Sequence, residues 1–147
     1  MADLIMRNFK KEMLQGNIDL DGDTFKVALL SGTNTIYENF ETMIAFSAAQ
    51  VYETSGTGYT AGGITLTANP ITLDGSDAIW DALDVTWEGS TINADAAVVY
   101  KFVTNANDSP LVCYVDLYNK LPVGYKTSNN GSFTIQWNTE GIISLGS

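Results

Sequence analysis

The spacing of apolar residues changes near residue 16. In the first segment the apolar side chains recur at helical intervals and form one stripe: Ile5, Met6, Phe9, Met13 and Leu14. Asp3 is placed to cap such a helix, and Gly16 stands where a left-handed residue commonly ends one. We therefore predict a short amphipathic N-terminal helix or arm within residues 1–16.

After residue 16 the chain consists of short apolar segments separated by turn sequences. Some alternate strictly, as in Phe133, Ile135 and Trp137. The predicted strands are 17–20, 24–30, 50–53, 63–69, 71–73, 78–87, 96–104, 110–117, 131–137 and 142–145. Many short strands at this spacing are typical of an antiparallel sandwich or barrel. We predict a mainly β single domain over residues 1–147, an antiparallel β-sandwich or barrel whose β-rich body is 17–147.

One stretch of the body has helical spacing again. Its recurring positions are Tyr37, Phe40, Ile44 and Ala48. They predict a second short helix near 37–49. The glycine-rich string that follows, residues 56–63, lacks the Gly-Lys-Ser/Thr end of a phosphate loop. We predict instead a tight turn in close contact with neighbouring backbone, with Tyr59 packed inward.

Charge narrows the possible partners. The 147 residues include 7 Lys and Arg against 17 Asp and Glu, for a formal net charge of −10 at pH 7. Arg7, Lys10 and Lys11 stand together in the first segment, so the rest of the chain is more acidic still. Because nucleic acids and anionic lipids are bound through Lys and Arg, we expect neither direct nucleic-acid binding nor a membrane partner.

The residue types also narrow the chemistry. The chain has no His and one Cys, which excludes Ser-His and Cys-His nucleophile pairs, imidazole zinc sites and an intramolecular disulfide. Cys113 lies in an apolar run, and we predict that it is a core residue. We expect no enzymatic activity, no cofactor and no metal centre. The alternating Asp19, Asp21 and Asp23 fail the EF-hand pattern, which leaves a solvated turn or a looser cation site.

An acidic stretch, residues 74–88, surrounds two of the three tryptophans. Trp80, Trp87 or Trp137 beside these acids would suit a carbohydrate-binding β-sandwich module. Burial in the core is the alternative for all three rings. Spacing alone does not decide between them.

Several strand and turn strings follow one another in a fixed order. They are residues 14–20, 23–30, 58–63, 84–87, 96–100, 111–116, 131–135 and 141–145. This series resembles a family of small β-rich structural proteins found among the head genes of tailed bacteriophages. The resemblance implies a non-enzymatic virion protein, a capsid decoration (cement) protein that binds and stabilises the head shell. A tail, head–tail connector or fibre-base component is the alternative.

The resemblance also implies partners. These are the major capsid protein and further copies of the chain, by analogy as a homotrimer. The first residues lack the apolar stretch of a signal peptide, so we expect a protein made in a cytoplasm. The resemblance implies that this is the host bacterial cytoplasm and that the final place is the capsid surface of the virion. The candidate partner-binding residues are Ile5, Met6, Arg7, Phe9, Lys10, Lys11 and Met13. The alternative for this segment is a helix packed on its own domain.

Overall fold

The structure, a computed structural model, describes residues 2–33, 37–118 and 124–146. The fold is mainly β, with 41% strand and 15% helix in antiparallel sheets that resemble a β-sandwich, which confirms the predicted fold class. Two short α-helices and two 3-10 helices accompany the strands: α1 (Arg7–Leu14), α2 (Phe46–Gln50), η1 (Tyr37–Thr42) and η2 (Ala106–Asp108).

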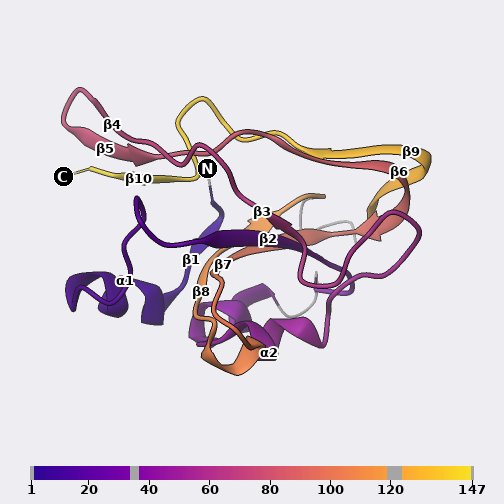
Figure 1. Cartoon of the computed structure of the whole chain (residues 1–147), viewed down its shortest axis with the longest axis horizontal. Helices are drawn as coiled ribbons and strands as arrows, with labels where there is room; N and C mark the ends of the chain where they lie inside the picture. The colour runs from indigo at the N-terminus through magenta and orange to yellow at the C-terminus, as the bar shows by residue number, and fades with distance from the viewer. Residues whose placement is uncertain (1, 34–36, 119–123, 147) are drawn as a thin grey trace.

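The strands form three antiparallel sheets. The largest has the order β1 (Leu4–Ile5), β8 (Leu111–Asp116), β7 (Ala96–Lys101), β2 (Phe25–Leu30) and β3 (Ile64–Thr65). The second has the order β10 (Ile143–Leu145), β5 (Asp77–Trp80) and β4 (Ile71–Asp74). The third pairs β6 (Val85–Ala94) with β9 (Lys126–Ile135). In Figure 1 the two smaller sheets lie on one side of the five-stranded sheet and both α-helices on the other.

The five-stranded sheet is covered on both faces, which explains why its central strands are almost continuously apolar. On one face, Phe25 of β2 contacts Trp80 of β5 with ring centroids 5.0 Å apart. On the other, Tyr100 of β7 stacks on Phe46 of α2 at 4.0 Å. Cys113 of β8 is fully buried, as predicted. A strand with both faces buried loses the strict alternation of a half-exposed one.

Two predicted strands are wrong for local reasons. Residues 17–20 form no strand, because the Asp19 carboxylate accepts the Asp21 N–H and the Asp19 carbonyl accepts the Asp23 N–H, which closes a turn. The predicted strand 78–87 is divided into β5 and β6. At the break, the Asp81 carboxylate accepts the Ala82 N–H, and residues 81–84 leave the ladder.

Three further bounds differ from the prediction. The strand expected at 63–69 is reduced to β3, and Ala68 is exposed with φ +50° rather than sharing an inner face. Of residues 50–53, Glu53 pairs with Leu30 in an isolated bridge. β9 begins at Lys126 rather than 131, because Asn130, with φ +51°, lies at an irregularity within the β6–β9 ladder instead of ending a strand.

The predicted second short helix near 37–49 is confirmed as α2, but the apolar face predicted for this segment is wrong. The chain forms η1 and then α2, and Ala45 between them is extended, with φ −119° and ψ 157°. Ala45 pairs with Pro110, so the backbone is held out of helical geometry there. As a result Ile44 and Ala48 are exposed, while Phe46 is buried.

Candidate functional site

The N-terminal helix starts later than its sequence indicates. Residues 4–5 pair with β8 in the registers Leu4 with Tyr114 and Ile5 with Cys113, so the chain is a strand before it becomes a helix. Asp3 does not cap α1, because its carboxylate accepts the Asp116 N–H at 2.7 Å. The prediction for the other end is confirmed, since Gly16 follows α1 with φ +78°.

The predicted partner-binding stripe on this segment is packed on the protein itself. Met6 is 0% exposed and Phe9 1%, while Ile5 and Met13 are half-buried against the same core. Met6 and Phe9 therefore belong to the protein's own core, which favours the alternative of a helix packed on its own domain, whereas Ile5 and Met13 keep part of their surface exposed. The pairing of β1 with β8 is the physical reason, because it fixes the start of α1 against the sheet.

The opposite face of α1 is exposed and carries the predicted cations. Arg7, Lys10, Lys11 and Leu14 are spaced as one helix face and all four are exposed, Leu14 to 90%. Among the described residues none of the three cations makes an ion pair. Sequence reasoning assigned Leu14 to the inner stripe; the structure places it at the end of the basic face. We call these four residues the outer face of α1.

The β10–β5–β4 sheet has one apolar face. Its register places Ile71 and Ile143 on either side of Trp80, and Leu73 and Leu145 on either side of Ala78. Directly paired residues point to the same face, and so do residues two apart along a strand. Trp80 and Ile143 are buried, whereas Ile71 is 50%, Leu145 50% and Leu73 80% exposed. Sequence reasoning missed this surface, because two- to four-residue apolar segments resemble ordinary core strands.

A hollow of about 240 Å³ separates this sheet face from the end of α1. Its lining includes Met13, Leu20, Ile71, Trp80 and Leu145, and is mostly apolar. The Trp80 indole N–H donates to the Leu20 carbonyl at 3.1 Å, and this hydrogen bond holds the ring in place in the lining of the hollow. In Figure 1, α1 and the β4–β5 hairpin lie at the same end of the molecule. We call the outer face of α1 together with the apolar face of this sheet the uncovered end.

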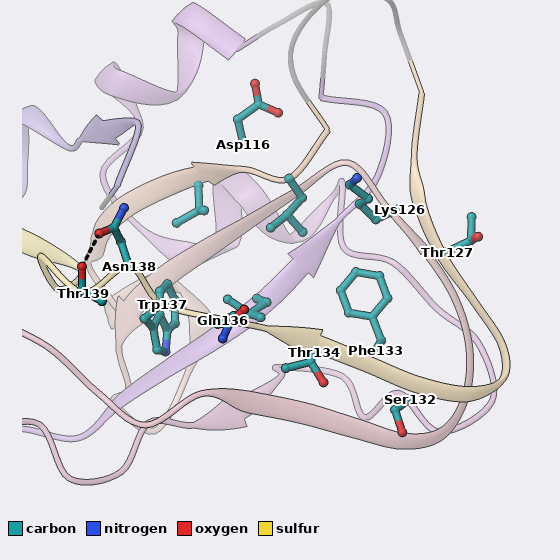
Figure 2. A pocket seen from close by; sticks show the side chains of 13 residues that line it. Asp116, Lys126, Thr127, Ser132, Phe133, Thr134, Gln136, Trp137, Asn138 and Thr139 are labelled. Carbon is teal, nitrogen blue, oxygen red and sulfur yellow. Dashed lines mark hydrogen bonds between the residues drawn. The ribbon is translucent and has the colours of Figure 1, made fainter.

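A larger open groove runs beside β9 (Figure 2). It measures about 750 Å³ and lies between the end of β8 and the segment 132–139. Trp137 lines it with Gln136 and Asn138. The Trp137 indole N–H donates to the Leu83 carbonyl at 3.0 Å, and its backbone N–H donates to Asp84 at 2.9 Å, so the ring is held in place.

The other two tryptophans cannot stack on a ligand. Trp80 and Trp87 are 2% and 3% exposed, so their rings belong to the core. Two acids of the stretch 74–88 accept hydrogen bonds from other parts of the protein. Asp84 accepts the Trp137 N–H, and Glu88 accepts a hydrogen bond from the Ser132 hydroxyl. Because Trp80 and Trp87 are buried, the carbohydrate hypothesis now depends on Trp137, the ring that lines the groove beside β9.

The Asp19–Asp23 turn uses its carboxylates internally. Asp23 forms an ion pair with Lys101 at 2.8 Å and accepts the Asp19 N–H. Partial burial raises the pKa of Asp23, but the hydrogen bonds from Lys101 and Asp19 outweigh it and lower the pKa overall. Within residues 2–33, 37–118 and 124–146 no group of three or more acids or Cys side chains is arranged to hold a metal ion.

Glu53 joins the glycine-rich turn to the sheet. Its carboxylate accepts the Tyr59 hydroxyl at 2.7 Å and the Gly62 N–H at 2.6 Å, while the Tyr100 hydroxyl donates to the Gly62 carbonyl at 2.6 Å. Burial, and then the Glu53 carboxylate, raise the pKa of Tyr59 far above its ordinary 10.0 and that of Tyr100 to about 12. The predicted inward packing of Tyr59 is confirmed.

No family model, curated protein or solved structure matches this chain. Among the described residues, no helix is long and apolar enough to cross a membrane.

Proposed function

We propose that this chain is a non-enzymatic structural protein of a tailed-bacteriophage virion, a capsid decoration protein present in many copies on the head shell. The observation that carries the proposal is the uncovered end. Soluble proteins that act alone rarely leave a contiguous apolar face open to water, and such faces commonly mark protein–protein contacts. The resemblance of the strand and turn strings to phage head proteins supports the head shell as the place of assembly.

Decoration needs a rigid body and repeated weak contacts rather than chemistry. A copy that touches neighbouring capsid subunits opposes their separation, and contacts made by linked copies add through effective concentration. The two covered faces of the five-stranded sheet supply rigidity. The net charge of −10 opposes non-specific association of unassembled copies.

Head binding tests the proposal directly. Purified heads that lack this protein are mixed with the purified chain and pelleted, and heads that already carry it serve as the saturated control. We expect stoichiometric uptake by the bare heads, little uptake by the control, and greater resistance of the loaded heads to heat. Protein that stays in the supernatant at every concentration contradicts the proposal.

A position at the tail, the head–tail connector or a fibre base is the alternative within the virion. It would use the same uncovered end but in a closed ring of few subunits. Copy number per particle separates the two positions.

Carbohydrate binding is a second candidate function, favoured by the groove beside β9. Trp137 offers a fixed aromatic ring, and Gln136 and Asn138 offer amides at the same groove. A glycan array with the intact chain and with Trp137→Phe and Gln136→Ala variants tests it. Hits that Gln136→Ala weakens support this function, and an array without hits contradicts it.

A further inference from the structure

The uncovered end carries both halves of an interface with itself. We propose that two copies of this chain associate across a two-fold axis, so that the outer face of α1 in each copy meets the β4–β5 hairpin of the other. This deepens the proposed function by naming the partner at the uncovered end, although its test needs no capsid. It differs from the trimer that the family resemblance implies.

The hairpin tip is a place that attracts cations. Asp74 and Asp77 are directly paired across the turn between β4 and β5. Like charges that face each other across a ladder destabilise it. Among the described residues, the ion pair is Lys101 with Asp23. Asp74 and Asp77 therefore have no cationic partner in their own copy within this part of the chain.

The outer face of α1 is the complementary half. Arg7, Lys10 and Lys11 form its cationic surface and lack an acidic partner among the described residues. The other described lysines are engaged: Lys101 pairs with Asp23, and Lys26 and Lys126 lie over aromatic rings at 4.1 Å and 5.6 Å. The cations free to meet an acidic partner are therefore concentrated on this helix.

The apolar residues of the uncovered end accompany these charges. Leu14 ends the basic face at 90% exposure, and Leu73 directly precedes the acidic tip at 80% exposure. The hollow between α1 and the sheet is lined by Met13, the neighbour of Leu14 in the chain, and by Ile71, two positions before Leu73. Covering these side chains removes apolar surface from water, and the adjacent ion pairs fix the orientation of the two copies.

Symmetry follows from the position of the two halves. α1 and the β4–β5 hairpin lie at the same end of the molecule (Figure 1). A two-fold axis brings the α1 of each copy to the hairpin of the other and makes the contact twice. The overall charge of −10 opposes association, so the local pairing of opposite charges is what distinguishes this contact from other faces.

Sedimentation equilibrium of the intact chain tests the inference. We expect a dimer for the wild type, and a dissociation constant at least about tenfold higher for Leu73→Glu, at a side chain whose exposure leaves the fold intact. Val51→Glu is the matched control, because Val51 is 78% exposed and follows α2, and it should dimerise as the wild type does.

Charge exchange makes the test specific to the pairing. Lys10→Glu/Lys11→Glu and Asp74→Lys/Asp77→Lys should each weaken the homodimer, since every contact then joins like charges. Their equimolar mixture should recover near wild-type dimerisation, because both contacts of the mixed pair join opposite charges again. A wild-type monomer at all concentrations, an oligomer of another order, an oligomer unaffected by Leu73→Glu, or a mixture no tighter than its parts each overturns the inference.

Pelleting with heads tests the capsid role separately from dimerisation. A monomer that still pellets with heads overturns the dimer and leaves decoration standing. A dimer that does not pellet with heads leaves the dimer standing and overturns decoration.

Discussion

Buried and half-buried carboxylates of this protein hold its loops against its sheets through hydrogen bonds. Glu53 is the clearest case, because one carboxylate accepts hydrogen bonds from Tyr59 and from the backbone of Gly62. The side chain of Asp95 does the same for Thr33, whose N–H and hydroxyl donate at 2.7 Å and 2.8 Å, although Asp95 is fully buried. These two acids therefore have a structural role, which their sequence context did not indicate.

We expect Glu53→Ala to lower the free energy of unfolding by about 1–3 kcal/mol, because it leaves two donors without their acceptor. Urea unfolding followed by tryptophan fluorescence measures it. Glu88→Ala is the control, since the exposed Glu88 accepts one bond from Ser132, and it should change stability by less than about 0.5 kcal/mol. Equal effects of the two substitutions would contradict the structural role of Glu53.

Cys113 makes the fold sensitive to alkaline pH. Burial raises the pKa of its thiol from an ordinary 9.0 to about 12. Below pH 9 the thiol is protonated in both the folded and the unfolded chain; above it the unfolded thiol ionises first, so stability falls as pH rises towards 12. The thiol's share of this loss is on the order of 1 kcal/mol at pH 10.

Urea unfolding at pH 8 and pH 10 measures this loss in the wild type and in Cys113→Ala. We expect the decrease between the two pH values to be smaller in the variant, whatever its absolute stability. An equal decrease in both proteins would show that the thiol ionises as readily when folded.

At the scale of elements, α1 has one face for the core and one for solvent. Phe9→Ala should destabilise by about 3–5 kcal/mol, because it removes a fully buried ring. Leu14→Ala, on the same helix but 90% exposed, should change stability by less than about 0.5 kcal/mol. Thermal unfolding of the two variants decides whether α1 is part of the domain. Similar, small effects would restore the picture of a detached arm.

The glycine-rich turn gives a second test at this scale. Gly63 has φ +79°, and a Cβ there would collide with the Val27 carbonyl of β2, so Gly63→Ala should cost at least about 3 kcal/mol. Gly75 also has a left-handed φ, +61°, but open space around it, so Gly75→Ala should cost about 1–2 kcal/mol. Chemical unfolding compares them, and a Gly63→Ala variant as stable as Gly75→Ala would contradict the close approach.

Strands with continuous apolar runs were predictable from the sequence, whereas segments decided by a local polar contact or by a single distant pairing were not. The strands that became β2, β7 and β8 are apolar enough to be recognised whatever lies over them. The segment 17–20 has the same appearance, but the side chain of Asp19 closes a turn there. Helical spacing failed near 37–49 because Ala45 pairs with Pro110, a contact 65 positions away that the local sequence does not show.

The candidate site was only half predictable for a related reason. The sequence concentrates Arg7, Lys10 and Lys11 near the N-terminus, and their exposure followed from their charge. The phase of the helix depends on where β1 ends, which moved Met6 and Phe9 into the core and Leu14 out of it. The exposed sheet face had no signal at all, because nothing in residues 71–73 or 143–145 shows that part of their surface stays uncovered.

At the scale of the whole molecule, the central sheet is covered on both faces, while the uncovered end leaves apolar side chains exposed to solvent. Exposed large apolar side chains occur at several places, among them Ile44, Val51 and Leu83. Ile71, Leu73 and Leu145 differ from these because they share one sheet face, at the same end of the molecule as α1. That shared face suits a protein partner better than a small ligand, and the resemblance to phage head proteins is the reason we propose a head shell as that partner.

Copy number per purified particle tests that account most directly. Quantitative mass spectrometry against the major capsid protein, on intact virions, gives the ratio of the two chains. Decoration of a shell predicts a ratio near a small whole-number fraction of the capsid subunits, on the order of hundreds of copies per head. Absence from virions, or about six or twelve copies as in a connector ring, would contradict it.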